Sequence, residues 1–164
     1  MNPLAYFITF TTYGSWLHGD KRNSVIRCRE GVKLLSPAEK LENYQKHRMK
    51  YSKVILNKKQ RKIVLKTIIE HCKVRKWKLW ATHIQNNHVH IITSAAVPAE
   101  KVMTQLKAWS TRKLRESGFN IPKVWTKHGS ARYLCSQEIL QQKIQYVIYE
   151  QGRVMEYYLD KDAL

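Results

Sequence analysis

Two short stretches rich in β-branched and aromatic residues, only three residues apart, constrain the fold of this chain most strongly. WKLWATHI (residues 77–84) and HVHIIT (residues 88–93) have the composition of strands, and two consecutive asparagines between them are typical of a turn. We therefore expect an antiparallel hairpin. Because side chains alternate along a strand, His88 and His90 then point to one face, roughly 6.6 Å apart along the chain. Two such imidazoles can bind one metal ion, although surface histidine pairs are also common in basic proteins.

The remaining sequence alternates between strand and helix patterns. In order, we expect a strand at 4–13, a long irregular loop at 15–35, a short helix from Ser36 to about residue 50, a longer helix from Asn57, the hairpin, a helix from Pro98 to about Ser117, a short strand near 132–135 and a last helix at about 136–152. Ser36 would cap the short helix, with Pro37 in its first turn and Glu39 completing a capping box. This order predicts one α/β (α+β) domain over residues 1–164, with an antiparallel central sheet and packed helices.

Apolar residues at helical spacing indicate which faces of the two central helices are buried. The expected stripes comprise Ile63, Val64, Ile68 and Cys72 on the first of them, and Val102, Leu106, Trp109 and Leu114 on the second. Gly118 is the expected stop of the second helix. Both helices would therefore cover the sheet with one apolar face and expose a basic one.

The charge of the chain favours a polyanionic partner. The sequence has 30 Lys and Arg against 12 Asp and Glu, a formal net charge of +18. Cations set against phosphates release condensed counterions, so nucleic acid is the expected partner and an anionic membrane surface the weaker alternative. The basic residues between Lys58 and Lys76, and the group Lys107, Arg112, Lys113 and Arg115, are candidates to contact a DNA backbone, although such helix faces are often merely solvated.

Cysteine spacing and hydropathy argue against several classes of protein. Cys28, Cys72 and Cys135 are far apart and form no Cys-x-x-Cys pair, so neither a zinc knuckle nor a disulfide framework is expected. No apolar run reaches the ~18 residues that span a bilayer, and the N-terminus lacks a signal-peptide pattern. We therefore expect a cytoplasmic protein with reduced thiols and no membrane partner.

The last helix, SQEILQQKIQYVIYEQG, contains the candidate nucleophile. Its buried stripe is expected to comprise Leu140, Ile144, Val147 and Ile148, which leaves Tyr146 away from the centre of the core face. Lys143 and Glu150 lie one turn before and one turn after Tyr146. A lysine there favours a phenolate, and a carboxylate there can reach a divalent cation that also polarises a phosphate. The structural alternative is a half-buried tyrosine with its hydroxyl in water, and Tyr149 competes for any role.

Other aromatic residues and histidines are secondary candidates for the site. Trp16, Trp109 and Trp125 could stack on unpaired bases, although the helical spacing of Trp109 is better explained by burial in the core. His18, His83 and His128 could also enter the site. His83 lies on the paired strand, but its spacing does not favour it over a structural histidine.

Four sequence features together resemble the HUH single-tyrosine transposases, and in particular the small insertion-sequence-like and REP-associated tyrosine transposases of bacteria. These features are the opening strand YFITFTTYGSWLHGD, the NNHVH motif, the segment WTKHGSARYL and the closing helix YVIYEQG, which run from about Tyr6 to Gln151. The resemblance implies an HUH nuclease domain around an antiparallel sheet, related to the RRM-like or ferredoxin-like fold. It also implies an ATP-independent DNA transposase and endonuclease that cleaves and rejoins single-stranded DNA beside a hairpin through a 5′-phosphotyrosine.

The same resemblance implies roles for individual residues. The paired metal-binding histidines of the family fall on His88 and His90, and its nucleophilic tyrosine falls on Tyr146. A further metal ligand, usually an amide four residues after the tyrosine, falls on Glu150, a carboxylate, and the neighbouring amide Gln151 is the alternative ligand. Imidazoles suit softer metals than magnesium, but a carboxylate and phosphate oxygens would complete the site, so magnesium or manganese is the expected divalent ion.

The sequence leaves two other functions and the oligomeric state open. A catalytically inactive nucleic-acid-binding regulator would keep the charge without needing a metal. A metal-dependent nuclease would use water in place of Tyr146 as the nucleophile. A covalent protein–DNA adduct separates the transposase from both. The resemblance is compatible with a homodimer that exchanges the tyrosine helix and, as in the REP-associated branch, with a monomer.

Overall fold

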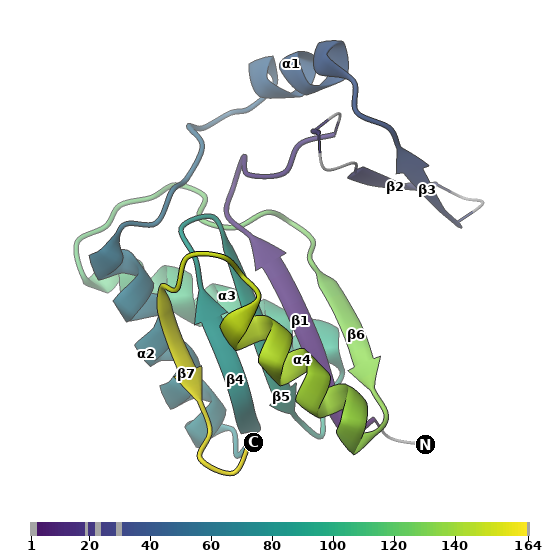
Figure 1. Cartoon of the computed structure of the whole chain (residues 1–164). Coiled ribbons are helices and arrows are strands. Elements are labelled where there is room, and N and C mark those ends of the chain that lie inside the picture. Colours follow the sequence, from purple (N-terminus) through teal and green to yellow (C-terminus); the bar gives the residue numbers. More distant parts are fainter. Residues whose placement is uncertain (1–2, 19, 22–23, 29–30, 164) are drawn as a thin grey trace.

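The computed structural model describes residues 3–18, 20–21, 24–28 and 31–163 (Figure 1). Its elements are, in chain order, β1 (Ala5–Thr11), β2 (Ser24–Cys28), β3 (Gly31–Leu35), α1 (Glu39–His47), α2 (Lys58–Val74), β4 (Lys78–Ile84), β5 (His88–Ser94), α3 (Ala99–Glu116), β6 (Ser130–Leu134), α4 (Gln137–Tyr149) and β7 (Glu156–Leu159). No helix among these described segments is long and apolar enough to cross a membrane.

Five of the described strands form one antiparallel sheet in the order β6-β1-β5-β4-β7. β4 and β5 are the predicted hairpin, in which His83 pairs with His90. The order β6-β1-β5-β4, with α2 and α3 as the connecting helices, is that of a ferredoxin-like βαββαβ unit. The predicted antiparallel α+β fold is therefore confirmed, and β7 extends the sheet beyond β4.

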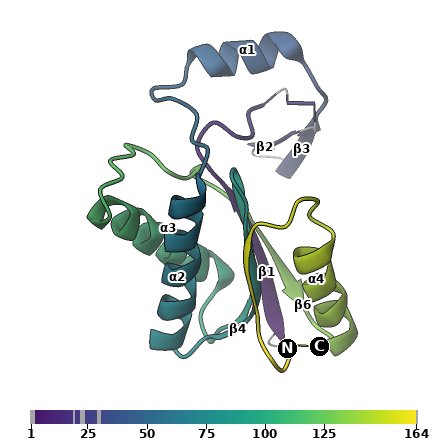
Figure 2. The same ribbon diagram turned by 60° about the vertical axis from the view of Figure 1, so that its left-hand side comes forward.

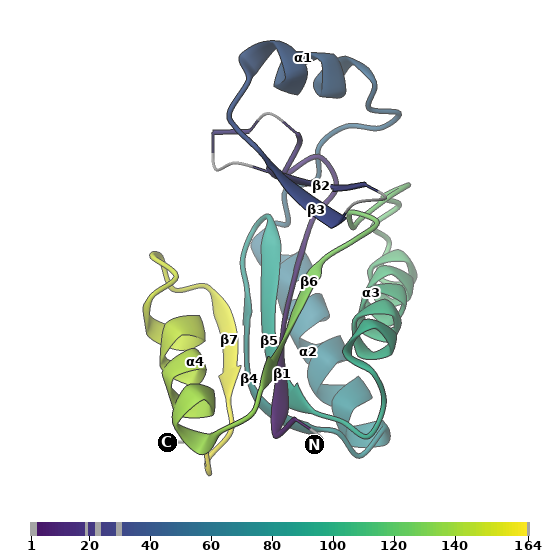
Figure 3. The same cartoon turned by 90° about the vertical axis from the view of Figure 1, so that its right-hand side faces the viewer.

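Helices cover both faces of this sheet. Seen nearly edge-on, α2 and α3 pack on one face and α4 packs on the other (Figures 2 and 3). Each helix buries the apolar stripe expected from its sequence, with Ile63 and Trp109 only half-buried. The core under α2 and α3 includes Ile8, Phe10, Ile68, Leu106 and Leu114, and the core under α4 includes Phe7, Ile92, Leu140, Ile144 and Val147.

Helix termini follow local sequence signals in α2 and α4. Asn57 caps α2 through a capping box with Gln60, and the Ser136 side chain accepts the Ile139 N–H at the start of α4. Gly118 has a φ of +86° directly after α3, as expected for its stop. The start of α1 was predicted wrongly, because its N-cap is Ala38 and not Ser36.

The prediction of an irregular loop at residues 15–35 was also wrong in part. β2 and β3 pair in a two-stranded hairpin, in which Val25 lies opposite Leu34. This hairpin lies with α1 beyond one end of the main sheet (Figure 1). Positions 19, 22–23 and 29–30 of the predicted loop lie outside the described residues. Charged residues interrupt the apolar alternation in this segment, which hid its strand pattern. β7 was not predicted at all.

Two of the three cysteines have described side chains, and both thiols are free. Cys72 is buried, and this burial raises the pKa of its thiol to about 12, so it is an unreactive core residue. Cys135 is exposed. The side chain of Cys28 lies outside the described part of the structure.

Candidate functional site

A pocket of about 200 Å³ lies on the α4 face, where β1 ends and β5 begins. It is lined by Thr9, Thr11, Ser15, Trp16, Asn87, His88, His90, Tyr146 and Gln151. The chain thus brings four of its predicted site residues together: His88 and His90 from β5, Tyr146 from α4, and Gln151 from the segment after α4. One chain supplies all of them.

Pairing with β1 fixes the two histidines. His90 lies opposite Thr9 and His88 lies opposite Thr11, so both rings stand on the same face, with their centroids 4.8 Å apart. His88 Nδ1 donates to Asn87 Oδ1 at 2.7 Å, and His90 Nδ1 lies 2.8 Å from the Thr9 hydroxyl. With each ring held through Nδ1, Nε2 is the nitrogen that could bind a metal ion, a common outer-shell arrangement.

Burial keeps His90 neutral. The residue is only 6% exposed, and this desolvation, reinforced by the nearby His88, lowers the pKa of His90 to about 3. A neutral imidazole retains the lone pair that a metal ion needs.

Tyr146 is half-buried beside these histidines. Its ring meets the rings of Phe7 and His90 edge-on, each with a centroid separation of 6.1 Å. The Lys143 ammonium lies over the tyrosine ring, 5.0 Å from its centroid, and so places a positive charge next to this side chain. Tyr149, the competing candidate, is 64% exposed on the outer side of the same helix.

His83 holds α4 to the sheet through a hydrogen bond. It is fully buried on β4, where Nδ1 donates to the Val147 carbonyl at 3.0 Å and Nε2 accepts the Met155 N–H at 3.0 Å. Burial lowers the pKa of His83, which is consistent with one protonated nitrogen. Sequence spacing gave this histidine no role. In the structure its two hydrogen bonds connect β4 to α4 and to the segment after α4.

The two candidates for the additional ligand are separated by the end of α4. The helix ends at Tyr149, and Glu150 is an exposed C-cap residue whose N–H donates to the Tyr146 carbonyl at 3.2 Å. Gln151 turns back into the pocket, where its Nε2 donates to the same carbonyl at 3.1 Å and its side chain also hydrogen-bonds His90. Gln85, which the sequence did not single out, donates to the Gln151 carbonyl at 2.8 Å and fixes this return of the chain.

Three side chains in the pocket could hold a divalent cation. Nowhere in the described residues do three or more His, Cys, Asp or Glu side chains gather in a way that could hold a metal. The set here instead combines the imidazoles of His88 and His90 with the amide of Gln151. The amide nitrogen of Gln151 donates to a carbonyl, so its oxygen is the atom that hydrogen-bonds His90, and a metal ion bound to this oxygen would replace that hydrogen bond.

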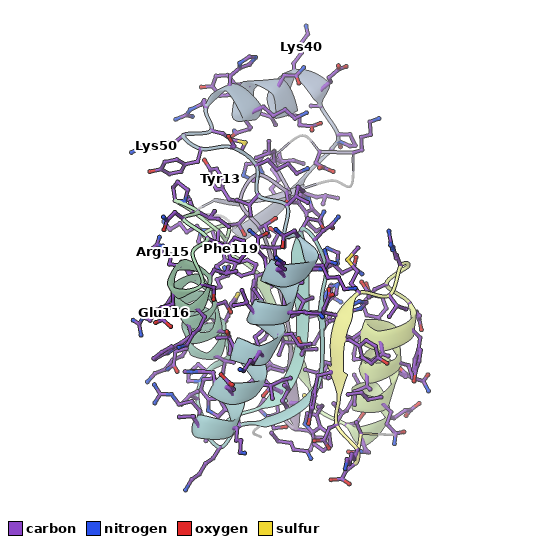
Figure 4. All side chains as sticks on the ribbon, turned by 90° about the vertical axis from the view of Figure 1, so that its left-hand side faces the viewer. Tyr13, Lys40, Lys50, Arg115, Glu116 and Phe119 are labelled. Carbon is purple, nitrogen blue, oxygen red and sulfur yellow. The ribbon has the colours of Figure 1, made fainter. Side chains whose placement is uncertain are left out.

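A second, larger hollow of about 940 Å³ lies on the opposite face of the sheet, between α3 and the segment that leads into β6. Its basic lining residues are Lys107, Arg112, Arg115, Lys127 and His128. We call this the α3 groove. Figure 4 shows Arg115 on the outer side of α3, and Lys113 of the predicted basic group is paired with Glu116 at 2.7 Å.

Lys107 builds one wall of the α3 groove. Its ammonium donates to the carbonyls of Thr126 at 2.9 Å and His128 at 3.0 Å, and burial lowers its pKa to about 8. Trp125 is buried beside it, and Arg112 covers the half-buried Trp109 at 4.3 Å from the ring centroid. Neither tryptophan therefore offers an open ring face to a base, whereas Trp16 is 45% exposed.

Comparisons with known proteins agree with this architecture. A family model described as "Transposase IS200 like" matches residues 45–149, more than half of the chain. Among solved structures, that of a REP-associated tyrosine transposase bound to a REP hairpin is similar, with a TM-score of 0.54 and 11% sequence identity over 92% of this chain and 67% of that chain. At this identity the similarity establishes the fold. A search of curated proteins gives no match.

Proposed function

The chain belongs to the IS200-like transposase family, and from this premise we propose that it cleaves and rejoins single-stranded DNA beside a hairpin, with Tyr146 as the nucleophile. The observation that carries the proposal is the pocket in which the half-buried Tyr146 shares a wall with His88, His90 and Gln151. A structural tyrosine would not need two imidazoles and an oriented amide beside it. The combination suits in-line attack on a phosphodiester.

We assign the binding of a divalent cation to His88, His90 and Gln151, with magnesium or manganese as the ion. Glu150, the position indicated by the family spacing, is the less favoured ligand because its side chain is exposed at the end of α4. The bound cation would stabilise negative charge on the scissile phosphate.

The reaction is a two-step transesterification. Tyr146 Oη attacks the phosphorus, the P–O3′ bond breaks, and the phenolic proton passes through solvent to the departing 3′-oxygen. The products are a 5′-phosphotyrosine and a free 3′-hydroxyl. In the second step a 3′-hydroxyl attacks this phosphotyrosine, which rejoins DNA and releases Tyr146. His83 and Gln85 keep the helix and its following turn in place, and Lys143 supplies positive charge beside the attacking group.

The α3 groove is the proposed contact for the DNA hairpin. Its arginines and lysines contribute to the net charge of +18, and they can contact successive phosphates. Thr126 lies between Trp125 and Lys127, which line this groove, and its hydroxyl is 3.1 Å from the hydroxyl of Thr11, which lines the catalytic pocket. A strand leaving the hairpin could therefore pass around the β6 edge of the sheet to reach Tyr146.

A monomer can carry the complete site in this proposal. α4 packs against β4 and β5 of its own chain, so exchange of the tyrosine helix in a homodimer is not required to bring Tyr146 to the histidines. A homodimer of two complete sites stays compatible with the geometry.

The test uses end-labelled hairpin DNA with a single-stranded tail, incubated with the protein and manganese. We expect a denaturant-resistant protein–DNA adduct that Tyr146→Phe abolishes and Tyr149→Phe keeps. Cleavage without an adduct would favour a nuclease that uses water. Tight binding with neither cleavage nor adduct would favour a DNA-binding regulator.

A further inference from the structure

Trp16 has no part in the proposed chemistry, although it lines the pocket that contains Tyr146 and both histidines. The residue lies five positions beyond the end of β1 and is 45% exposed. The pocket lining therefore includes a partly exposed aromatic side chain beside the groups assigned to phosphate chemistry.

The turn before Trp16 is firmly anchored. Ser15 is buried, its N–H donates to the Thr12 carbonyl at 3.1 Å, and the two hydroxyls lie 2.6 Å apart. Thr12 in turn donates its N–H to the Asn87 carbonyl at 2.9 Å and its hydroxyl to the Val54 carbonyl at 2.7 Å. The residue preceding Trp16 is thus tied to the turn that presents His88.

The other side of this turn is held equally closely. Tyr13 donates its N–H to the Val124 carbonyl at 2.8 Å, and its hydroxyl accepts the Lys50 N–H at 3.1 Å, with both side chains visible in Figure 4. Gly14 has a φ of +75°, and a Cβ at this position would collide with Met49 and lie 3.2 Å from Lys53 Cα. The turn before Trp16 is therefore held by contacts on both sides, and only glycine fits at position 14.

We propose that Trp16 forms a nucleobase subsite, in which its indole ring stacks on an unpaired base next to the phosphate that Tyr146 attacks. The position of that phosphate rests on the proposed function. The other lining residues offer imidazoles, hydroxyls and amides, which suit a phosphate or a cation. An indole offers a flat, uncharged surface, which suits the face of a base.

The subsite selects single-stranded nucleic acid. Bases inside a duplex already have neighbours on both faces, whereas an unpaired base gains a partner by stacking on an aromatic ring. Stacking at a fixed point of the pocket wall also fixes the adjoining phosphate, so Trp16 would contribute to alignment as well as to affinity.

The test measures binding of a hairpin oligonucleotide that carries a tail of eight thymidines, in manganese, to protein with Tyr146→Phe so that no cleavage occurs. An abasic site is placed at each tail position in turn. Each oligonucleotide is compared between Tyr146→Phe alone and Tyr146→Phe combined with Trp16→Ala, Trp16→Phe or Tyr44→Ala. Tyr44 is a matched control, because it is 55% exposed on α1 and lies outside the pocket lining found in the described residues.

We expect one tail position at which the abasic site weakens binding about 10- to 100-fold, the range for one base–aromatic stack. Trp16→Ala should remove this penalty, while Trp16→Phe and Tyr44→Ala keep it. Equal abasic penalties with and without Trp16→Ala would overturn the subsite.

A second measurement does not depend on the folding of a Trp16 variant. Single thymidines of the tail are replaced by 5-iododeoxyuridine, and the Tyr146→Phe protein is cross-linked with light and analysed by mass spectrometry. A cross-link at Trp16 supports the subsite, and cross-links confined to other residues contradict it. Because both measurements omit the tyrosine, a missing adduct in the wild-type protein would refute the nucleophile and leave the subsite standing.

Discussion

The two faces of the sheet are built differently. The face under α2 and α3 is covered by helices of 17 and 18 residues, whereas α4 on the other face has 13 residues and ends at Tyr149. The shorter helix leaves the C-terminal end of β1 and the N-terminal end of β5 uncovered, and there Tyr146 and the histidines line a pocket. The longer helices bury their apolar stripes and present basic residues outward. We therefore expect that chemistry and hairpin binding belong to opposite faces and can be separated by mutation.

The largest separation should come from Tyr146→Phe. Removing the attacking hydroxyl should lower adduct formation by roughly 10⁴-fold or more, because a lost nucleophile is not replaced by binding. Hairpin affinity, measured by fluorescence anisotropy, should change by less than about twofold, because the phenol ring and its contacts with Phe7 and His90 are kept. A large loss of affinity would mean that the two faces do not act separately.

The ligand assignment on the α4 face can be sharpened with two adjacent residues. Gln151→Ala should raise the manganese concentration for half-maximal adduct formation by about 10- to 100-fold, the usual effect of disturbing a metal site. Glu150→Ala, its matched control, should leave this concentration within about twofold because the side chain is exposed. The opposite result would assign the ligand to Glu150 and to the family spacing.

The α3 face should respond in the reverse way. Arg112→Ala combined with Arg115→Ala should weaken hairpin binding by about tenfold and reduce the slope of log affinity against log salt by about 1.8, or about 0.9 for each lost phosphate contact. The rate of adduct formation at saturating DNA should stay unchanged.

Lys62→Ala combined with Lys66→Ala is the control for this pair, because both lysines are exposed on α2. A greater loss of affinity in the α2 pair than in the arginine pair would move the hairpin contact from the α3 groove to α2.

The smallest expected effect concerns the wall of the α3 groove. Lys107→Met removes the ammonium that donates to the Thr126 and His128 carbonyls, and should lower the free energy of unfolding by about 1–2 kcal/mol. Urea denaturation measures this change. Lys101→Met, at an exposed position of the same helix, should stay within about 0.5 kcal/mol of the wild type. Equal stability of the two variants would deny Lys107 its structural role.

Local sequence patterns predicted most of the sheet and the helices that cover it. Periodic apolar residues and the Asn57 and Ser136 caps are signals within single elements, and they placed Tyr146 correctly at the border of the core. β7 escaped prediction because it is four residues long and is held by distant partners. Its Glu156 pairs with β4 through the backbone and with Arg61 of α2 through its side chain.

The candidate site was predictable only as far as its motifs reach. His88, His90 and Tyr146 lie in recognisable patterns, and the structure brings them to one pocket. The choice between Glu150 and Gln151 depends on where α4 ends. Gln85, which directly follows β4, donates to the Gln151 carbonyl and holds the chain that returns after α4. The spacing of four residues after Tyr146 therefore pointed to Glu150, whose side chain is exposed in the fold.

Mass spectrometry of the DNA adduct is the most direct test of whether Tyr146 is the nucleophile. Cleavage after Lys143 and Arg153 by trypsin releases residues 144–153, a peptide that contains both Tyr146 and Tyr149. After nuclease digestion of the DNA, fragmentation locates the remaining 5′-nucleotide on one of the two side chains. We expect the nucleotide to be attached to Tyr146. Attachment to Tyr149, or an unmodified peptide from protein that has cleaved DNA, would contradict it.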